Sequence, residues 1–188
     1  MAHRLYRNTV DLAPEVRKSI ADGILSPVPI TLRPPLRLCR LVDRSRRYEG
    51  AVAPWWIAEG DLTTIFNARE ANRAAHGGDK ARALSLGFFA RSALGIPQTW
   101  KDGTRTTLDM LLQADLKADG LLAFVGKGRA QHETAPSGID LKWSPWSSIT
   151  QIYIPALART KRHEPTLADL ESIMTLGAAR YFVSRPVY

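Results

Sequence analysis

Apolar residues at helical spacing predict helices along much of the chain. In residues 11–25, Val16, Ile20 and Ile24 fall on one helical face, and Pro14 stands where a first turn accepts proline. The same spacing predicts further helices over residues 54–75, 76–97, 104–120 and 164–177. The predicted N-caps are Asp61, Asp79 and Thr166, the last with Asp169 in a capping-box pattern, and the predicted stops are Gly95, Gly120 and Gly177.

Four other segments have the character of strands. Residues 36–42 follow two prolines, residues 121–128 are a continuous apolar run closed by glycines, and residues 147–155 are rich in β-branched side chains. Residues 181–183 also have strong β propensity. The stretch between the second and third of these strands, residues 129–146, is expected to be a long functional or mobile loop.

The order helix, strand, helices, two strands, helix and strand predicts an α+β fold. We expect a central mixed or antiparallel sheet, with helices inserted after the first core strand. A length of 188 residues with 45% hydrophobic content suits one domain over residues 1–188, in which residues 1–30 form a helical N-terminal extension. The sequence has no apolar run that suits a membrane span or a Sec signal, so we expect a cytoplasmic protein, or one delivered into a target cell without Sec export.

Charge narrows the range of partners. The chain carries 26 Lys and Arg against 18 Asp and Glu, a net charge of +8, which favours nucleic acid, a nucleotide or an acidic protein as partner. The basic residues are spread from end to end, with short clusters only at residues 44–47 and 159–163. Such dispersed clusters are more typical of a solvated surface than of a nucleic-acid groove.

Several kinds of catalytic site have no support in the sequence. The glycines of residues 126–128 lack the spacing and context of a phosphate-binding loop. The four histidines stand apart from one another, and the single cysteine, Cys39, excludes an internal disulfide and a cysteine metal cage. The serines of residues 144–148 lack the glycines of a nucleophile elbow. We therefore expect no metal, and a serine hydrolase is disfavoured.

One arginine breaks the apolar pattern of the first core strand. Leu38 and Val42 share a face with Arg40, while Arg37 and Cys39 fall on the other face, which is expected to be polar or mixed. An unpaired charge among apolar side chains is unfavourable, so Arg40 requires an anion or a cleft. A phosphate would satisfy its guanidinium, and pairing with an acid or escape at a sheet edge is the structural alternative.

Aromatic and amide side chains complete the candidate site. Trp55 and Trp56 follow the basic segment that contains Tyr48, and aromatic rings can stack on a base at about 1–3 kcal/mol each. Gln151 lies in the late β-rich segment, where a carboxamide can hold a ribose hydroxyl. The structural alternatives are core packing for the two tryptophans and a solvent-facing position for Gln151.

Taken together, the segments LRLCRLVD, YEGAVAPWW, GKGRAQ, PSGIDLKW and ITQIYIP resemble the ADP-ribosyltransferase-like fold of bacterial NAD-consuming toxins. The resemblance lies in an arginine in the first core strand, an aromatic-rich segment soon after it, and a late strand with Glu or Gln. It implies that NAD is the substrate, and that Arg40, with Trp55 or Trp56 and nearby Tyr48, binds it. It also implies that Gln151 and Arg40 are the catalytic residues.

The resemblance implies cleavage of the nicotinamide–ribose bond, for ADP-ribosyl transfer or for NAD hydrolysis, by positioning and electrostatics. A clear Ser-Thr-Ser motif and the paired glutamates of known branches are absent, and Gln151 stands where a glutamate is expected. Glutamine cannot act as a general base, which favours hydrolysis, an unusual acceptor or no catalysis.

An acidic inhibitory protein is a further expected partner. The alternative function is a basic, non-catalytic protein that binds nucleic acid or serves phage or secretion assembly.

Overall fold

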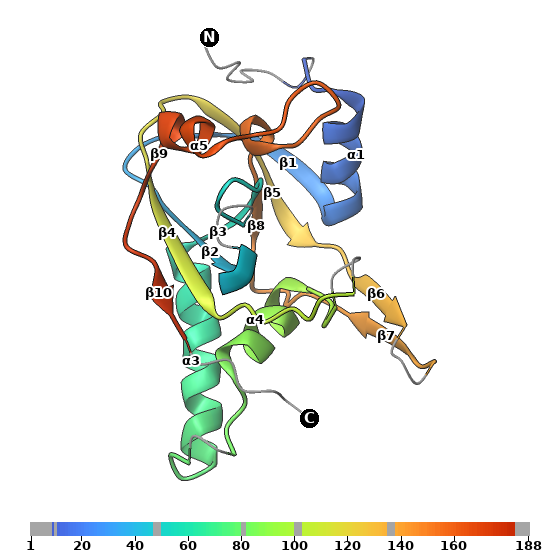
Figure 1. Cartoon of the computed structure of the whole chain (residues 1–188), viewed down its shortest axis with the longest axis vertical. Coiled ribbons are helices and arrows are strands. Elements are labelled where there is room, and N and C mark those ends of the chain that lie inside the picture. The colour runs from blue at the N-terminus through green and yellow to red at the C-terminus, as the bar shows by residue number, and fades with distance from the viewer. Residues whose placement is uncertain are drawn as a thin grey trace.

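The computed structural model describes residues 9, 11–46, 50–79, 82–99, 103–134 and 138–182. Its main sheet has the strand order β1, β5, β8, β3, β2, β4, β10, with β9 paired to β4 (Figure 1), and every strand pair in the described residues is antiparallel. The predicted α+β class is confirmed, with an antiparallel sheet and helices inserted after the first predicted strand.

The strands are β1 (Ile24–Leu32), β2 (Arg37–Val42), β3 (Trp55–Ala58), β4 (Met110–Leu116), β5 (Leu121–Gly128), β6 (Gln131–Thr134), β7 (Asp140–Trp143), β8 (Gln151–Tyr153), β9 (Met174–Leu176) and β10 (Arg180–Tyr181). The α-helices are α1 (Pro14–Gly23), α3 (Glu59–Ala75), α4 (Leu86–Leu94) and α5 (Leu167–Ile173). Two short 3-10 turns are η1 (Arg44–Arg46) and η2 (Pro155–Leu157).

Several predicted ends are confirmed by the structure. Gly95 ends α4 in the left-handed region, with φ of 68°, as a C-cap glycine does. Thr166 and Asp169 form the predicted capping box at the start of α5. Asp61 lies inside the first turn of α3 rather than at its N-cap, and Ser85, not Asp79, caps α4 by accepting the Phe88 N–H.

The helix predicted over residues 104–120 is wrong, because this segment forms β4. The strand lies between β2 on one side and β9 and β10 on the other, and almost all of its side chains are buried. A strand buried on both faces has a nearly continuous apolar run, which helical spacing also fits. The sequence pattern therefore could not distinguish the two.

Further segments differ from their predictions. Residues 55–58 form β3 and residues 174–176 form β9, where the two helices were predicted to begin and to end. The first helix ends at Gly23 and the chain continues as β1, which pairs with β5, so residues 24–30 are a strand of the main sheet and not part of a helical extension. Pro27 and Pro29 make a helical continuation impossible and are tolerated because β1 is an edge strand. The predicted loop over residues 129–146 contains a small hairpin, β6 and β7.

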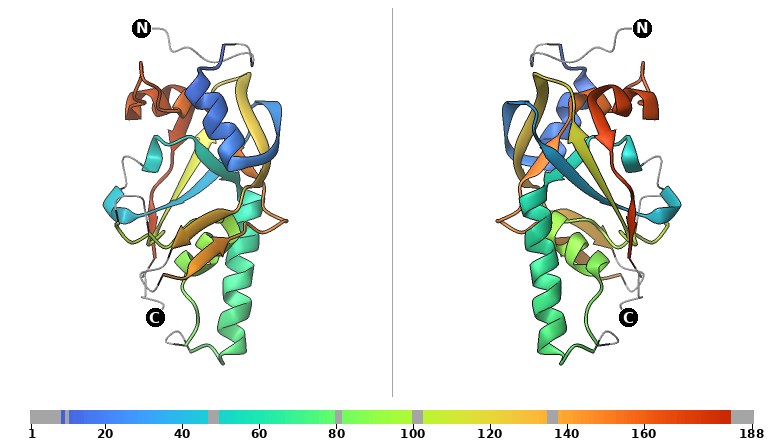
Figure 2. Two further views of the ribbon diagram at one scale, coloured as in Figure 1. Left: turned by 90° about the vertical axis from the view of Figure 1, so that its right-hand side faces the viewer. Right: turned by 90° about the vertical axis from the view of Figure 1, so that its left-hand side faces the viewer.

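Three apolar clusters hold helices against the sheet. On one face, α5 and η2 cover a cluster centred on Leu38, Trp56 and Leu112. On the other face, α3 and α4 pack against Cys39 and Ile57 of β2 and β3, while α1 packs on β5 and β8. The face of β2 that was expected to be polar or mixed is therefore a second core. Figure 2 shows α1 lying across one end of the sheet and α3 extending away from it.

A group of buried polar residues, which we call the polar junction, joins α4 to the start of β4. Asp43 is 2% exposed and its carboxylate accepts the N–H groups of Thr107 (2.8 Å) and Leu108 (2.7 Å) and the Thr107 hydroxyl (3.1 Å). Arg91 of α4 is 5% exposed and donates to the Thr106 carbonyl at 2.8 Å. These bonds hold Leu108 in a left-handed conformation, with φ of 47°.

Candidate functional site

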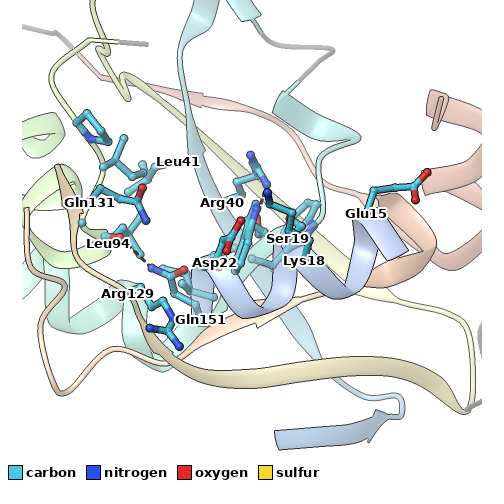
Figure 3. Close-up of a pocket in the computed structure, with 18 residues that line it drawn as sticks. Glu15, Lys18, Ser19, Asp22, Arg40, Leu41, Leu94, Arg129, Gln131 and Gln151 are labelled. Atoms are coloured by element: carbon cyan, nitrogen blue, oxygen red, sulfur yellow. Dashed lines mark hydrogen bonds between the residues drawn. The ribbon is translucent and has the colours of Figure 1, made fainter. Parts of the chain in front are cut away.

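A cavity of about 590 Å³ lies between α1, the end of α4 and the sheet (Figure 3). Ligand sites of small molecules occupy about 300–1,000 Å³, so this volume suits a nucleotide-sized compound. The lining residues come from six parts of the chain: Glu15, Lys18, Ser19, Asp22 and Gly23 of α1; Cys39, Arg40 and Leu41 of β2; Trp55, Trp56 and Ile57 of β3; Leu94 to Pro97 at the end of α4; Arg129 and Gln131 at the start of the hairpin; and Gln151 of β8.

Arg40 lies where β2 and β3 separate. The two strands pair only at Leu38 with Ala58 and at Cys39 with Ile57, and beyond this point the Arg40 guanidinium donates to the Ala53 carbonyl (3.2 Å) and to the Trp55 carbonyl. It therefore satisfies backbone acceptors that lack a strand partner on that side.

The charge of Arg40 has no carboxylate partner among the residues that the structure describes. Its Nε is buried and makes no hydrogen bond. Burial lowers the pKa of Arg40 to about 10, so the side chain is still a cation at neutral pH. A half-buried cation without a counter-charge is unfavourable, and an anion in the adjoining cavity would offset that cost.

The two tryptophans have different surroundings. Trp56 is 2% exposed, lies in the core and donates its indole N–H to the Ala53 carbonyl at 3.1 Å. Trp55 is half-buried, contacts the Tyr153 ring edge-on at 4.7 Å and packs against Gly23, where a Cβ would lie 2.1 Å from the indole. Trp55 is thus the ring with surface available to a ligand in the cavity.

Gln151 lines the cavity from β8. Its amide nitrogen donates to the Leu94 carbonyl at the end of α4, at 2.8 Å (Figure 3). Gly128 is directly beside it, because a Cβ on residue 128 would lie 2.3 Å from the same nitrogen. The late-strand amide is therefore fixed by contacts from two other elements.

The α1 wall of the cavity is attached to the rest of the fold at both ends. At its C-terminal end, the Gly23 carbonyl accepts the Arg129 N–H at 2.8 Å. Near its N-terminal end, Glu15 accepts the Lys161 N–H at 3.0 Å, and this bond lowers the pKa of the Glu15 carboxyl. The wall also contributes Lys18 and Asp22 to the lining, so groups of both charges surround the cavity.

The structure brings Arg40, Trp55, Trp56 and Gln151 to one cavity, although they are far apart in the sequence. Tyr48, the other predicted ligand contact, lies outside the described residues. Sequence reasoning missed the roles of Gly23, Gly128 and the end of α4. The Gly95 stop marked where that helix ends, but nothing in the sequence indicated that the end meets Gln151. The binding of NAD by these residues stays a prediction.

The described residues contain neither a helix suited to a membrane nor a cluster of metal-binding side chains. No helix in that part of the chain combines the length and the apolar character needed to cross a bilayer. In the same residues, no group of three or more His, Cys, Asp and Glu side chains could hold a metal ion.

Comparison with known proteins gives one structural likeness. No protein-family model matches the chain, and no curated protein matches it. Among solved structures, the fold is similar to one described as "Rhs1-CT in complex with cognate immunity protein RhsI1", with a TM-score of 0.47 and 14% identity over 93% of this chain and 98% of that one. A likeness of this degree assigns neither a fold family nor an activity to the chain.

Proposed function

We propose that the chain is an NAD-consuming effector that cleaves the nicotinamide–ribose bond. The observation that supports this most is the meeting of Arg40, Trp55 and Gln151 in one cavity of about 590 Å³. Had they lain in separate parts of the fold, the proposal would have failed on geometry. The same three positions carry the resemblance to NAD-consuming toxins, and they lie on β2, β3 and the much later β8.

The charges around the cavity suit a molecule such as NAD, which has an anionic diphosphate and a cationic pyridinium ring. Lys18, Arg40 and Arg129 are the cations of the lining and would attract the diphosphate. Trp55 offers an aromatic surface to the ring, whose positive charge favours such contact. We assign diphosphate attraction to Arg40 and ring contact to Trp55.

The reaction needs no residue that changes oxidation state. The bond between the nicotinamide nitrogen and ribose C1 breaks, and its electron pair stays on the nitrogen and neutralises the ring. A water oxygen then bonds to C1 and its proton passes to solvent; in ADP-ribosyl transfer, an acceptor group replaces the water. Fixed charges and positioning groups can lower the barrier of such a step without a strong base.

An acidic inhibitory protein is part of the same proposal. A host cell that makes an NAD-consuming enzyme needs protection from it, and a chain with a net charge of +8 favours association with an acidic partner.

The test is an NAD-cleavage assay on the full chain, with nicotinamide release measured by chromatography. We expect wild type to release nicotinamide and Arg40→Met to lower the rate about 100- to 1,000-fold, the range for loss of one electrostatic group of an active site. The matched control is Arg37→Met, since Arg37 is in the same strand but is exposed and paired with Asp115 at 2.8 Å. No nicotinamide release by wild type, together with no NAD binding by calorimetry, would overturn the proposal.

A further inference from the structure

The C-terminal end of α4 sets the orientation of the Gln151 carboxamide. The last carbonyls of a helix have no partner within it, and here the Ala93 carbonyl accepts the Trp146 N–H at 3.0 Å while the Leu94 carbonyl accepts Gln151 Nε2 at 2.8 Å. A carbonyl accepts and cannot donate, so the nitrogen of Gln151, and not its oxygen, has to face Leu94.

The side-chain oxygen of Gln151 can therefore accept a hydrogen bond from a group in the cavity. In the part of the chain that the structure describes, no donor is bonded to Oε1, and this atom is not among the buried polar atoms that lack a partner. Figure 3 shows the amide nitrogen turned to Leu94 and the oxygen pointing away from it. The cavity wall therefore presents a neutral acceptor in a fixed direction.

Gly128 provides the space that this arrangement needs. A Cβ at residue 128 would lie 2.3 Å from Gln151 Nε2 and 2.8 Å from its Cδ, distances at which one group has to move. The φ angle of Gly128 is not in the left-handed region, so the requirement is for space alone. An alanine here would displace the carboxamide from Leu94.

We infer that Gln151 is a fixed acceptor for a hydroxyl group of the ligand, oriented by the Leu94 carbonyl and by the missing side chain at residue 128. This inference rests on the proposed function, in which the hydroxyl belongs to the ribose of NAD. It also explains why residue 151 is a glutamine. An ionised glutamate would place an oxygen opposite the Leu94 carbonyl, so the position requires a donor, which at neutral pH an amide supplies and a carboxylate does not.

The decisive variant is Q151E, measured beside wild type at pH 7.5 and pH 5. At pH 7.5 we expect its melting temperature to fall by about 5 °C, because the carbonyl of Leu94 loses its donor and meets a charge. NAD cleavage should fall about 100-fold. A carboxyl group in this place is more stable protonated, with its O–H donating to Leu94 and its C=O facing the cavity as glutamine does. The folded state then binds more protons than the unfolded state, so the difference in melting temperature should shrink at pH 5.

The charged groups that line the cavity are the same in wild type and in Q151E, so the paired measurement removes their contribution. They are Glu15, Lys18 and Asp22 of α1, Arg40 of β2 and Arg129 after β5. Q131E places the same charge in the same cavity, and we expect it to show a smaller pH-dependent difference, since Gln131 has no recorded bond to Leu94.

A second variant tests the space beside the amide. G128A should lower NAD cleavage about 10-fold, whereas G60A should not, because nothing lies within 4 Å of a Cβ on Gly60 in α3. If wild type cleaves NAD but Q151E melts with no pH-dependent difference or G128A is fully active, the inference is wrong and the proposed function stands. If the melting data are as expected but wild type neither binds nor cleaves NAD, the proposed function fails and the orientation of Gln151 is supported.

Discussion

Two arginines lie in apolar surroundings, and their partners differ. Arg91 and Arg40 each have a buried Nε without a hydrogen bond, and each donates to backbone carbonyls. Burial lowers the pKa of Arg91, as it does for Arg40, and the nearby Arg105 adds to this, but the carboxylates of Asp43 and Glu133 oppose it. For Arg40, burial acts alone. The charge of Arg91 is therefore opposed by carboxylates of the fold itself, whereas Arg40 has no carboxylate partner in the described residues, and an anion for it would have to come from outside.

The largest expected effect is a contrast in stability between these two arginines. Arg91→Met should lower the free energy of unfolding by about 3–5 kcal/mol, because it removes a buried cation whose charge interacts with Asp43 and leaves the Thr106 carbonyl without its donor. Arg40→Met should lower it by less, about 1–2 kcal/mol, because it removes a charge that has no carboxylate partner in the described residues but also leaves the Ala53 and Trp55 carbonyls without their donor. Urea unfolding of both variants measures the difference. Equal losses would remove the distinction between the two sites.

The second prediction concerns the carboxylate of the polar junction. Asp43→Ala should cost about 3 kcal/mol, since two N–H groups and a hydroxyl lose their acceptor in a buried place. The control is Asp115→Ala, whose partner Arg37 is about half exposed, and which should change the free energy of unfolding little. If Asp43→Ala lowered the free energy of unfolding by less than Asp115→Ala does, the polar junction would contribute little to stability.

The third prediction concerns the aromatic wall of the cavity. Trp55→Ala should weaken NAD binding about 10- to 100-fold, the equivalent of one stacked ring at about 1–3 kcal/mol. Tyr181→Ala is a suitable control, because that ring is exposed on β10 and does not line the cavity. Titration calorimetry gives both affinities. An unchanged affinity for Trp55→Ala would indicate that the ring is held for packing against Gly23 and Tyr153 only.

The smallest expected effect is a pH dependence at the hairpin. Burial alone would raise the pKa of Glu133, but hydrogen bonds from Thr99, from the Gln98 N–H (2.8 Å) and from the Trp143 indole (3.1 Å) together lower it. The carboxylate therefore stabilises the fold above the ordinary pKa of glutamate, near 4.3, and this contribution is lost as pH falls below it.

Glu133→Gln should remove that dependence. We expect wild type and variant to differ by no more than about 1 kcal/mol at pH 7, because the group is largely solvated, and to converge near pH 3. Urea unfolding curves between pH 7 and pH 3 measure this difference in the free energy of unfolding. A gap that persists at pH 3 would contradict the assignment to the charge of Glu133.

The sequence predicted the class of the fold better than its elements. Capping residues were informative because their chemistry is local, as at Thr166 and Gly95. The segment of β4 was assigned wrongly, since burial on both faces removes the alternation by which a strand is recognised. For the cavity, the sequence indicated which side chains were unusual. It could not indicate the helix end or the two glycines beside them, because their roles depend on contacts between distant segments.

The positions of the lining residues in the sequence also determine how late in folding the cavity can form. Its members run from Glu15 near the start of the described chain to Gln151, with α1 attached to Arg129 and Lys161. Contacts of such long sequence separation form late, because the loops that they close cost entropy first. During synthesis, a ribosome would have to release almost the whole of this segment before the full lining could assemble. Any activity of this cavity would therefore begin only after most of the described chain has been made.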